Sequence, residues 1–371
     1  MKSCYKLGEL IRNVDVKNKD LHCNNLRGLS MTKEFRPSTS NIVGTDLSKY
    51  KIVAQKQFAC DFMSTIRVHK MPIAFNTGKE EILVSPAYAV FEVVDEKIIL
   101  PEYLMMWFSR TEFDRYADFR SDAAIRGGFG WNELCETSIS IPCITDQYKI
   151  VFEYQAITER IALKQKINDN LLDSVQAIFR SWFVDYDPFD GVCPSNWETG
   201  CVEDIAEFFD SMRKPLSSLE RTDMERIYPY YGAVSIVDYV DDYIFDGEYL
   251  LVSEDGIYVV DENGHPLIQH ISGKFWANNH AHILKGKSGF NEDSLYLFLA
   301  NTNMAPIVTG AAQPKINQAN LKSFPITIPD SETMLKFNNI IQPFFDQRLT
   351  NESEIKKLEA LQSLLLTRLV D

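Results

Sequence analysis

Two stretches of the chain carry apolar residues at intervals that alternate between four and three positions. The first runs from Ile150 to Trp182 and the second from Phe337 to Leu369, and both become polar near their middle. This spacing is typical of a heptad seam, so it predicts two long helices, within residues 143–185 and 330–371, that pack against each other. The apolar residues expected at this helix pair and its partner contacts are Ile157, Ile161, Leu171, Ile178, Trp182, Ile341, Ile355, Leu358 and Leu365.

Two features of these patterns leave alternatives open. Pro343 lies inside the second pattern, which predicts either a kink or a delayed start of that helix. Polar residues at the centre of a seam usually fix the register and the partner at some loss of stability. The alternative to a helix pair is two separate amphipathic helices, each lying on its own domain.

The segments ahead of the helices, residues 1–142 and 186–329, have a different pattern. They contain short runs rich in β-branched residues, such as 88–94 and 249–252, which are separated by turn signals such as Asn263 with Gly264. Each segment also contains one short helical pattern. The expected fold is therefore α+β, with two mixed, strand-rich domains in tandem and a long helix after each.

The two halves of the chain are related by an internal repeat. The last fourteen residues repeat the pattern of residues 172–185 at a constant offset of 186. Upstream of the helices, Ile141 and Pro142 return as Ile328 and Pro329, and Leu134 returns as Leu321. Because the front segments have diverged while the helices kept their length, we expect two different tasks on one shared frame.

Charge is distributed unevenly between the two front segments. The formal net charge of the 371 residues is −14, but residues 1–142 carry 19 Lys and Arg against 18 Asp and Glu, whereas residues 190–329 carry 9 against 20. Phosphate attraction needs several cations at the DNA backbone. DNA affinity would therefore come from local patches or from a basic partner.

The remaining composition is typical of a cytoplasmic protein. No apolar run approaches the ~18 residues that span a bilayer, and the N-terminus lacks the apolar core of a signal peptide. Seven cysteines without a CxxC spacing are expected to be reduced structural thiols.

Catalytic motifs are largely excluded by their spacing. The chain lacks the glycine-rich loop and the Asp/Asn-Pro-Pro-aromatic string of an adenine methyltransferase, and Ala281 stands where a P-loop needs glycine. His280 and His282 share one face of an expected strand, yet hydrogen bonding or a polar surface explains them better than a metal site. We therefore expect a reader or organiser without catalytic residues or a bound metal.

Several ordered motifs resemble those of one known family, the specificity subunits of Type I restriction-modification systems. The first is the string IFRSWFVDYDPF at residues 178–189, which ends the first helix. The others, spread through both halves, are residues 46–53, 84–91, 228–233, 246–256, 276–284 and 313–321. The resemblance covers nearly the whole chain.

This resemblance implies a function in DNA recognition. Residues 1–142 and 186–329 would be two target recognition domains, each reading one half of a bipartite, asymmetric DNA sequence. Residues 143–185 and 330–371 would form an antiparallel spacer. The implied partners are double-stranded DNA, two methyltransferase subunits that use S-adenosylmethionine, and restriction subunits that use ATP and Mg²⁺; this chain would need no cofactor and be no enzyme.

Two other functions compete with this one. The chain could be a coiled-coil scaffold that binds only proteins, or a self-sufficient methyltransferase, which would bind S-adenosylmethionine by itself. For the DNA reader, the expected contacts are cations, amides and aromatic residues in polar loops. They are Lys33, Arg36, Lys79, Arg67 and Arg126 in the first domain, and Arg213, Lys214, Tyr230, Tyr231, Lys315 and Asn317 in the second.

Overall fold

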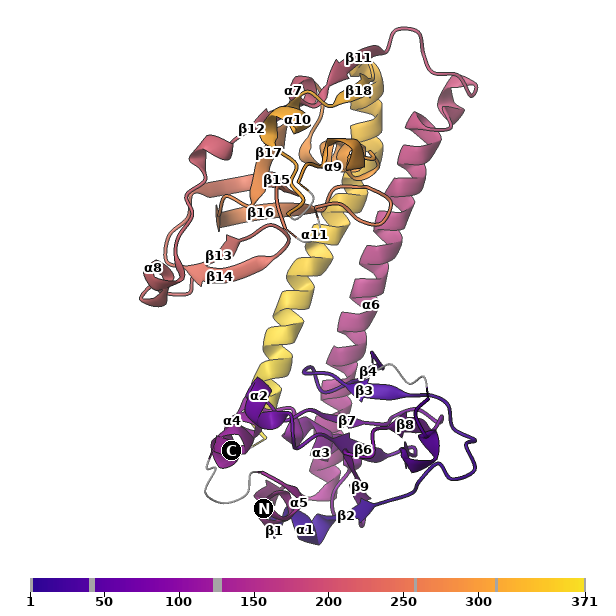
Figure 1. Ribbon diagram of the computed structural model, residues 1–371, viewed down its shortest axis with the longest axis vertical. Helices are drawn as coiled ribbons and strands as arrows, with labels where there is room; N and C mark the ends of the chain where they lie inside the picture. Colours follow the sequence, from indigo (N-terminus) through magenta and orange to yellow (C-terminus); the bar gives the residue numbers. More distant parts are fainter. Residues whose placement is uncertain (1–2, 40–43, 123–128, 257–258, 311–312, 370–371) are drawn as a thin grey trace. The chain divides into compact units, whose positions relative to one another are not determined.

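The computed structural model describes residues 3–39, 44–122, 129–256, 259–310 and 313–369 (Figure 1). The chain divides into two compact units. The first contains Met1–Lys164 together with Glu354–Asp371, and the second contains Gln165–Ser353. Because the division falls inside both long helices, each helix contributes one part to each unit. The four-part division expected at residues 142, 185 and 329 remains a prediction.

In both units the first strand is followed by a one-turn helix and a second strand, which confirms the internal repeat. In the first unit these elements are β1 (Ser3–Lys6), α1 (Leu7–Leu10) and β2 (Ile11–Val14). In the second unit they are β11 (Glu198–Cys201), α7 (Val202–Ile205) and β12 (Ala206–Phe208). The first strand of each unit pairs antiparallel with the last, which is β10 (Ser138–Ile141) in one unit and β18 (Pro325–Ile328) in the other.

The short helix before each last strand is also shared. It is α5 (Trp131–Glu136) in the first unit and α10 (Gln318–Lys322) in the second. Leu134 and Leu321, which match in the sequence repeat, are both fully buried in these helices. The residues that the two halves share therefore build the frame of each unit.

Between these frame elements, the first unit contains a small antiparallel sheet with the strand order β2-β9-β6-β7, and two further strand pairs, β5 with β8 and β3 with β4. The strands are β3 (Arg27–Leu29), β4 (Phe35–Pro37), β5 (Lys51–Val53), β6 (Gln57–Cys60), β7 (Ile73–Phe75), β8 (Ile82–Val84) and β9 (Ala89–Val93). The helices are α2 (Thr65–Val68), α3 (Pro101–Phe108), α4 (Thr111–Asp122) and the 3₁₀ turn Leu47–Lys49. Rings from the sheet and from α3 form the core: Phe58 and Phe91 stack at 4.9 Å, and Phe108 packs edge-on against both.

The second unit contains a larger sheet of six strands in the order β12-β17-β15-β16-β13-β14. The pairs are antiparallel except that of β13 with β16. Its strands are β13 (Tyr228–Tyr231), β14 (Ile236–Val240), β15 (Phe245–Ser253), β16 (Ile268–Ala277) and β17 (Ala281–Gly286). Its helices are α8 (Ser218–Thr222), α9 (Glu292–Ala300) and the 3₁₀ turns Asp187–Phe189, Asp210–Met212 and Ala305–Ile307.

Helix α9 joins the sheet of the second unit to the long helices, which are α6 (Ile144–Phe183) and α11 (Ser331–Thr367). In Figure 1, α9 lies between β15–β17 and these helices, and Phe298 on α9 packs against Phe179 and Phe183 of α6. Phe337 of α11 completes this cluster through its contact with Phe183.

The sheets and helices of the two units together confirm the expected α+β fold.

The heptad prediction is confirmed by burial, since every residue of both predicted seams is buried or half-buried. In the second unit, Val175 of α6 shares a buried cluster with Ile341 of α11. In the first unit, Ile150 near the start of α6 packs in the same cluster as Leu369, which follows the end of α11. The beginning of each helix thus packs with the end of the other, so the two run antiparallel.

Polar contacts hold the middle of this helix pair. Arg160 and Lys164 of α6 both pair with Glu354 of α11, with 2.8 Å between Lys164 Nζ and Glu354 Oε2. These cations lower the pKa of Glu354. Helix α11 begins well before Pro343 and continues through it, so the delayed start considered for this helix is wrong.

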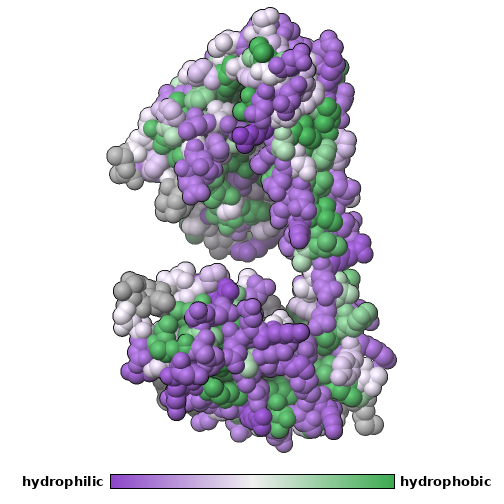
Figure 2. Space-filling model, turned by 90° about the vertical axis from the view of Figure 1, so that its right-hand side faces the viewer, coloured by the Kyte–Doolittle hydropathy of each residue, from purple (hydrophilic) through white to green (hydrophobic). Residues whose placement is uncertain are grey.

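Several further expectations concern the surface and the thiols. All seven cysteines are free, as expected. Some large apolar side chains reach solvent, among them Phe152 and Leu163 on α6, and Figure 2 shows hydrophobic patches among hydrophilic residues on one face. Within the described residues, no helix combines the length and apolarity needed to cross a membrane.

Candidate nucleic-acid interface

In the first unit, Lys33 is buried and anchors the turn of the β3–β4 hairpin. Its Nζ donates to Asp114 Oδ1 and to the carbonyl oxygen of Phe108, both at 2.7 Å. Burial lowers the pKa of Lys33, although the carboxylate of Asp114 opposes this shift. The ammonium group is thus enclosed by its partners and does not face solvent, and the contact of Lys33 with DNA remains a prediction.

Arg36 and Arg67 do come together. Both side chains are exposed, and both line one cavity of about 400 Å³ in the first unit. Lys79 is exposed on the turn after β7, away from the residues that line this cavity. Arg126 lies outside the described residues.

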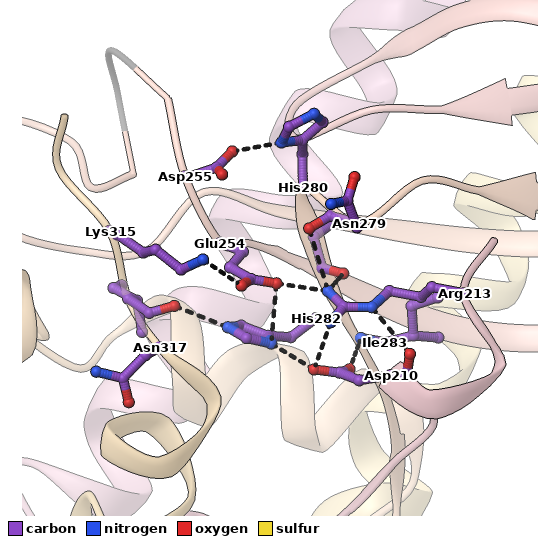
Figure 3. A network of polar contacts seen from close by, with 12 residues as sticks. Asp210, Arg213, Glu254, Asp255, Asn279, His280, His282, Ile283, Lys315 and Asn317 are labelled. Carbon is purple, nitrogen blue, oxygen red and sulfur yellow. Dashed lines mark hydrogen bonds and ion pairs between the residues drawn. The ribbon is translucent and has the colours of Figure 1, made fainter. Parts of the chain in front are cut away.

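In the second unit, Arg213 belongs to a partly buried ionic network, shown in Figure 3. Its guanidinium lies 2.5 Å from Glu254 Oε2 and 3.3 Å from Asp210 Oδ2, and it donates to the carbonyl oxygen of Ala281 at 2.7 Å. The network joins the end of β15 to the 3₁₀ turn after β12. Arg213 therefore stabilises this unit and does not present its charge freely to DNA.

His282 is the centre of this network and is completely buried on β17. Its Nε2 lies 2.8 Å from the carbonyl oxygen of Ile316, and its Nδ1 lies 2.6 Å from Asp210 Oδ2. A carbonyl oxygen only accepts hydrogen bonds, so Nε2 carries a proton and donates to the loop that precedes α10. His282 thus connects the sheet to the loop that carries Lys315.

The carboxylates around His282 are held in their charged form. Burial opposes ionisation of Asp210, but the hydrogen bond with His282 lowers its pKa below the usual value. Burial likewise opposes ionisation of Glu254, while Lys315 and Arg213 lower its pKa. Lys315 Nζ lies 2.8 Å from Glu254 Oε1, so the buried carboxylate of Glu254 holds this lysine in position.

Asp210, Glu254 and His282 also have the donor types of a metal site, and their ligand atoms lie within 4.8 Å of one another. The donor set fits a divalent cation poorly, because Arg213 and Lys315 already neutralise the two carboxylates. His280, expected on the same strand face, lies instead in the turn before β17, where it is exposed and pairs with Asp255 at 2.7 Å. The ionic network is therefore structural.

The remaining predicted residues of the second unit lie in different settings. Tyr230 is buried, and its hydroxyl accepts from the backbone N–H of Leu216 at 2.9 Å, so the structure gives it a packing role and its contact with DNA remains a prediction. Tyr231 is half-buried in the sheet, and burial raises its pKa. Lys214 is exposed, with Nζ 6.0 Å from the centre of the Trp276 ring.

Asn317 also has a structural role, because its Oδ1 accepts the backbone N–H of Asn320 at 2.8 Å and caps α10. The structure thus leaves Lys214 and the partly exposed Lys315 as the accessible cations among the residues predicted for this unit.

The sequence analysis missed three residues beside Arg36. Asp61 and Tyr88 line the same cavity, and Arg27 lies with Arg36 and Tyr88 around a second cavity of about 140 Å³. The pairing of Gly28 with Arg36 across the hairpin sets this arrangement. A hairpin prediction for residues 27–37 would have suggested Arg27, but no local pattern connects either residue to Asp61.

Comparisons with known proteins agree on one family. The family model of the Type I restriction modification DNA specificity domain matches residues 194–361. A protein of Haemophilus influenzae with the name of a type I restriction enzyme specificity subunit is 39% identical over 128 residues, 34% of this chain and 32% of its own length. The type I restriction enzyme MjaIX specificity subunit of Methanocaldococcus jannaschii is 21% identical over 330 residues, 82% of this chain and 74% of its own length.

A solved structure has the same fold. The crystal structure of the S subunit of a Type I restriction-modification system from M. genitalium superimposes with a TM-score of 0.58 over 100% of this chain and 96% of that one, at 12% sequence identity. The strong match to the Haemophilus protein spans about a third of that relative. Similarity over the full length therefore rests on the weaker sequence match and on the fold.

Proposed function

We propose that this chain is a specificity subunit of a Type I restriction-modification system and recognises a bipartite, asymmetric DNA sequence. The proposal is supported by the family-model match over residues 194–361 and by the similarity to the MjaIX specificity subunit. It would work in the cytoplasm, where it positions two adenine-N6 methyltransferase subunits and, in systems that restrict, two restriction subunits. The scaffold that binds only proteins is not favoured by these relatives.

One observation carries the proposal, namely that a repeated frame supports two different inserts. Leu134 and Leu321 are buried at matching places, and each unit closes by pairing its first and last strands. Between these strands the first unit has a small sheet and the Arg36 hairpin, whereas the second has six strands and the His282 network. Two different surfaces on equivalent frames suit two different half-sites.

We propose further that the chain is not itself an enzyme and binds no cofactor. Its histidine and carboxylate cluster is neutralised by Arg213 and Lys315, which supports a structural role. The methyltransferase subunits would use S-adenosylmethionine, and the restriction subunits ATP and Mg²⁺. Equilibrium dialysis of the isolated chain with S-adenosylmethionine should then detect no binding, and stoichiometric binding would contradict this part of the proposal.

The direct test maps N6-methyladenine across the genome of a host that has the intact system. Deleting the gene for this chain should erase methylation at one bipartite motif, while motifs of other methyltransferases remain. Returning the gene should restore the same motif. A methylome that does not change on deletion, in a host whose methyltransferase partner is expressed, would refute the proposal.

A further inference from the structure

The cavity beside Arg36 combines hydrogen-bond donors with a fixed acceptor. It has a volume of about 400 Å³ and lies entirely in the first unit. The polar residues that line it come from the β3–β4 hairpin, from the start of α2 and from the turn before β9: Ser30, Arg36, Asp61, Ser64, Arg67 and Tyr88. Three separate segments thus bring two arginines, one carboxylate and one aromatic ring to the same space.

The guanidinium group of Arg36 lies over Gly28, its partner across the hairpin. A Cβ atom at Gly28 would lie 3.6 Å from Arg36 Cζ, an ordinary van der Waals distance, which shows that the flat group lies directly over this position. Nε of Arg36 donates to the carbonyl oxygen of Leu29 at 3.2 Å, and Nη1 donates to Thr39 Oγ1 at 3.4 Å. These contacts hold the group in one orientation while its side chain remains exposed.

Asp61 supplies the acceptor, and its carboxylate is held just as firmly. Its Oδ1 accepts the backbone N–H of Met63 at 3.0 Å, and its Oδ2 accepts the hydroxyl of Ser64 at 2.6 Å. Ser64 Oγ in turn accepts a hydrogen bond from Arg67 Nη2 at 3.3 Å. Oδ1 also accepts the backbone N–H of Ser64 at 3.3 Å. Each carboxylate oxygen has two lone pairs, so Oδ2 keeps one with which Asp61 can accept from a ligand.

DNA could place either a backbone phosphate or the edge of a base pair in this cavity, and the groups that line it favour the base pair. A site for a backbone phosphate needs donors and positive charge, and the anionic Asp61 would repel it. A G·C pair presents the N7 and O6 acceptors of guanine in the major groove, next to the N4 donor of cytosine. Arginine and a carboxylate are the side chains that match these two edges.

We propose that this cavity reads one G·C base pair in the half-site of the first unit, with Arg36 and Arg67 donating to guanine and Asp61 accepting from cytosine. The inference rests on the proposed function, because it names one base pair within the DNA target. A two-stranded hairpin fits the width of the major groove, so β3–β4 can bring Arg36 to the base edge.

A buried ion pair positions the two arginines. Asp114 Oδ1 accepts from Lys33 Nζ at 2.7 Å and also from the backbone N–H of Met71 at 3.1 Å. Lys33 belongs to the hairpin that carries Arg36, and Met71 follows the helix that carries Arg67. Asp114 therefore ties both segments to α4, and Lys33 and Asp114 are positioning residues for this cavity.

The test uses the full chain together with its methyltransferase partner, in a host where the motif of the wild type has been mapped. Arg36→Ala and Asp61→Asn should each relax one position of one half-site, and that position should be G·C in the wild type. The ratio of methylation at G·C over other pairs should fall about 5- to 150-fold there, the range expected for one bidentate contact. The other half-site should keep its sequence.

Two further variants make the result decisive. Arg36→Lys keeps the charge but loses the planar pair of donors, so it should relax the same position as Arg36→Ala. Arg12→Ala removes an exposed arginine that pairs with Glu92, outside the cavity, and should leave the motif intact. If Arg36→Ala abolishes all methylation, the base preference of the Arg36→Lys variant shows whether Arg36 reads the G·C pair.

The outcomes separate the inference from the proposed function. Uniformly weaker methylation with an intact motif would mean phosphate contact, and relaxation at an A·T pair, or no change in any variant, would equally overturn the G·C assignment. A different result would refute the proposed function itself: in that case even the wild-type chain would direct no methylation at a bipartite motif.

Discussion

Asn351 Nδ2 donates a 2.7 Å hydrogen bond to Oδ1 of Asn168, and both side chains are buried between α11 and α6 in the second unit. Gln347 Nε2 donates to Asn351 Oδ1 at 3.0 Å. If one helix slid along the other, these amides would face apolar residues of the seam. The polar layer therefore selects one register of the helix pair.

The first prediction concerns the stability of this layer. Asn168→Ala should lower the free energy of unfolding by about 1–3 kcal/mol, because the amide of Asn351 loses its buried acceptor. The double variant Asn168→Leu with Asn351→Leu should recover much of this loss, since neither buried amide then remains and the exposed Gln347 can bond to water in place of Asn351. Urea unfolding followed by circular dichroism measures both, with the exposed Lys166→Ala as control. A double variant less stable than the single one would contradict this account.

The second prediction concerns the pair of Lys33 with Asp114. Lys33→Met should cost about 3–5 kcal/mol, because it leaves a buried carboxylate without its cation. Arg115→Ala breaks the exposed pair with Glu112 on the same helix and should cost no more than about 1 kcal/mol. The same urea experiment compares the two. Equal effects would mean that Lys33 is solvated.

The third prediction is a pH dependence of the second unit. Burial, together with the nearby carboxylates of Glu248, Asp346 and Glu292, raises the pKa of Asp293 from 3.8 to about 7. Burial also lowers the pKa of His270, whose Nδ1 is 3.5 Å from Asp293 Oδ1, to about 4. Both side chains are therefore neutral in the folded protein near pH 5.5.

Between pH 4 and pH 7 the folded chain keeps a proton on Asp293 that the unfolded chain has released. The contribution of Asp293 to stability therefore falls as pH rises through this window, and the loss reaches about 4 kcal/mol above pH 7. Asp293→Asn should remove the loss, so its stability relative to wild type should rise from pH 4 to pH 8. Glu359→Gln, at an exposed position of α11, serves as control. A variant less stable than wild type at pH 8 would show that Asp293 is ionised and paired with His270.

The fourth prediction concerns the proposed spacing of the half-sites. Deleting one heptad from each helix, residues 158–164 and 355–361, keeps the seam in phase and shortens each helix by roughly 10 Å. If the helices set the spacer, the methylated motif should lose about three base pairs between its half-sites. Both half-sites should keep their sequences, because the deletions lie outside the two sheets. A changed base within a half-site would contradict this division of roles.

The features that the sequence predicted correctly are periodic or repeated. The heptad seams, the repeat of Leu134 as Leu321 and the α+β class all follow from patterns that are local or that occur twice. The boundaries of the compact units cannot be derived from such patterns. They depend on contacts between distant residues, because the start of α6 and the residues at the end of α11 are buried in the same cluster.

The surroundings of the predicted DNA contacts could not be derived from the sequence, for a physical reason. A lysine in a polar loop has the same sequence signature whether it faces solvent or an acid that is 81 residues away, as Lys33 does. Arg213 is similar, since Glu254 is 41 residues away. Arg36 and Arg67 are exposed, as a polar loop predicts, whereas only the folded chain shows that Asp61 lines the same cavity.

The composition of the first unit has a consequence for how the protein matures during synthesis. This unit includes Glu354–Asp371, and Leu369 is buried in its core. The second unit, Gln165–Ser353, is continuous in sequence. A ribosome therefore makes most of the first unit before the second unit, but it makes residues 354–371 only after the second unit is complete. The second unit can thus finish folding while the first unit still lacks part of its core.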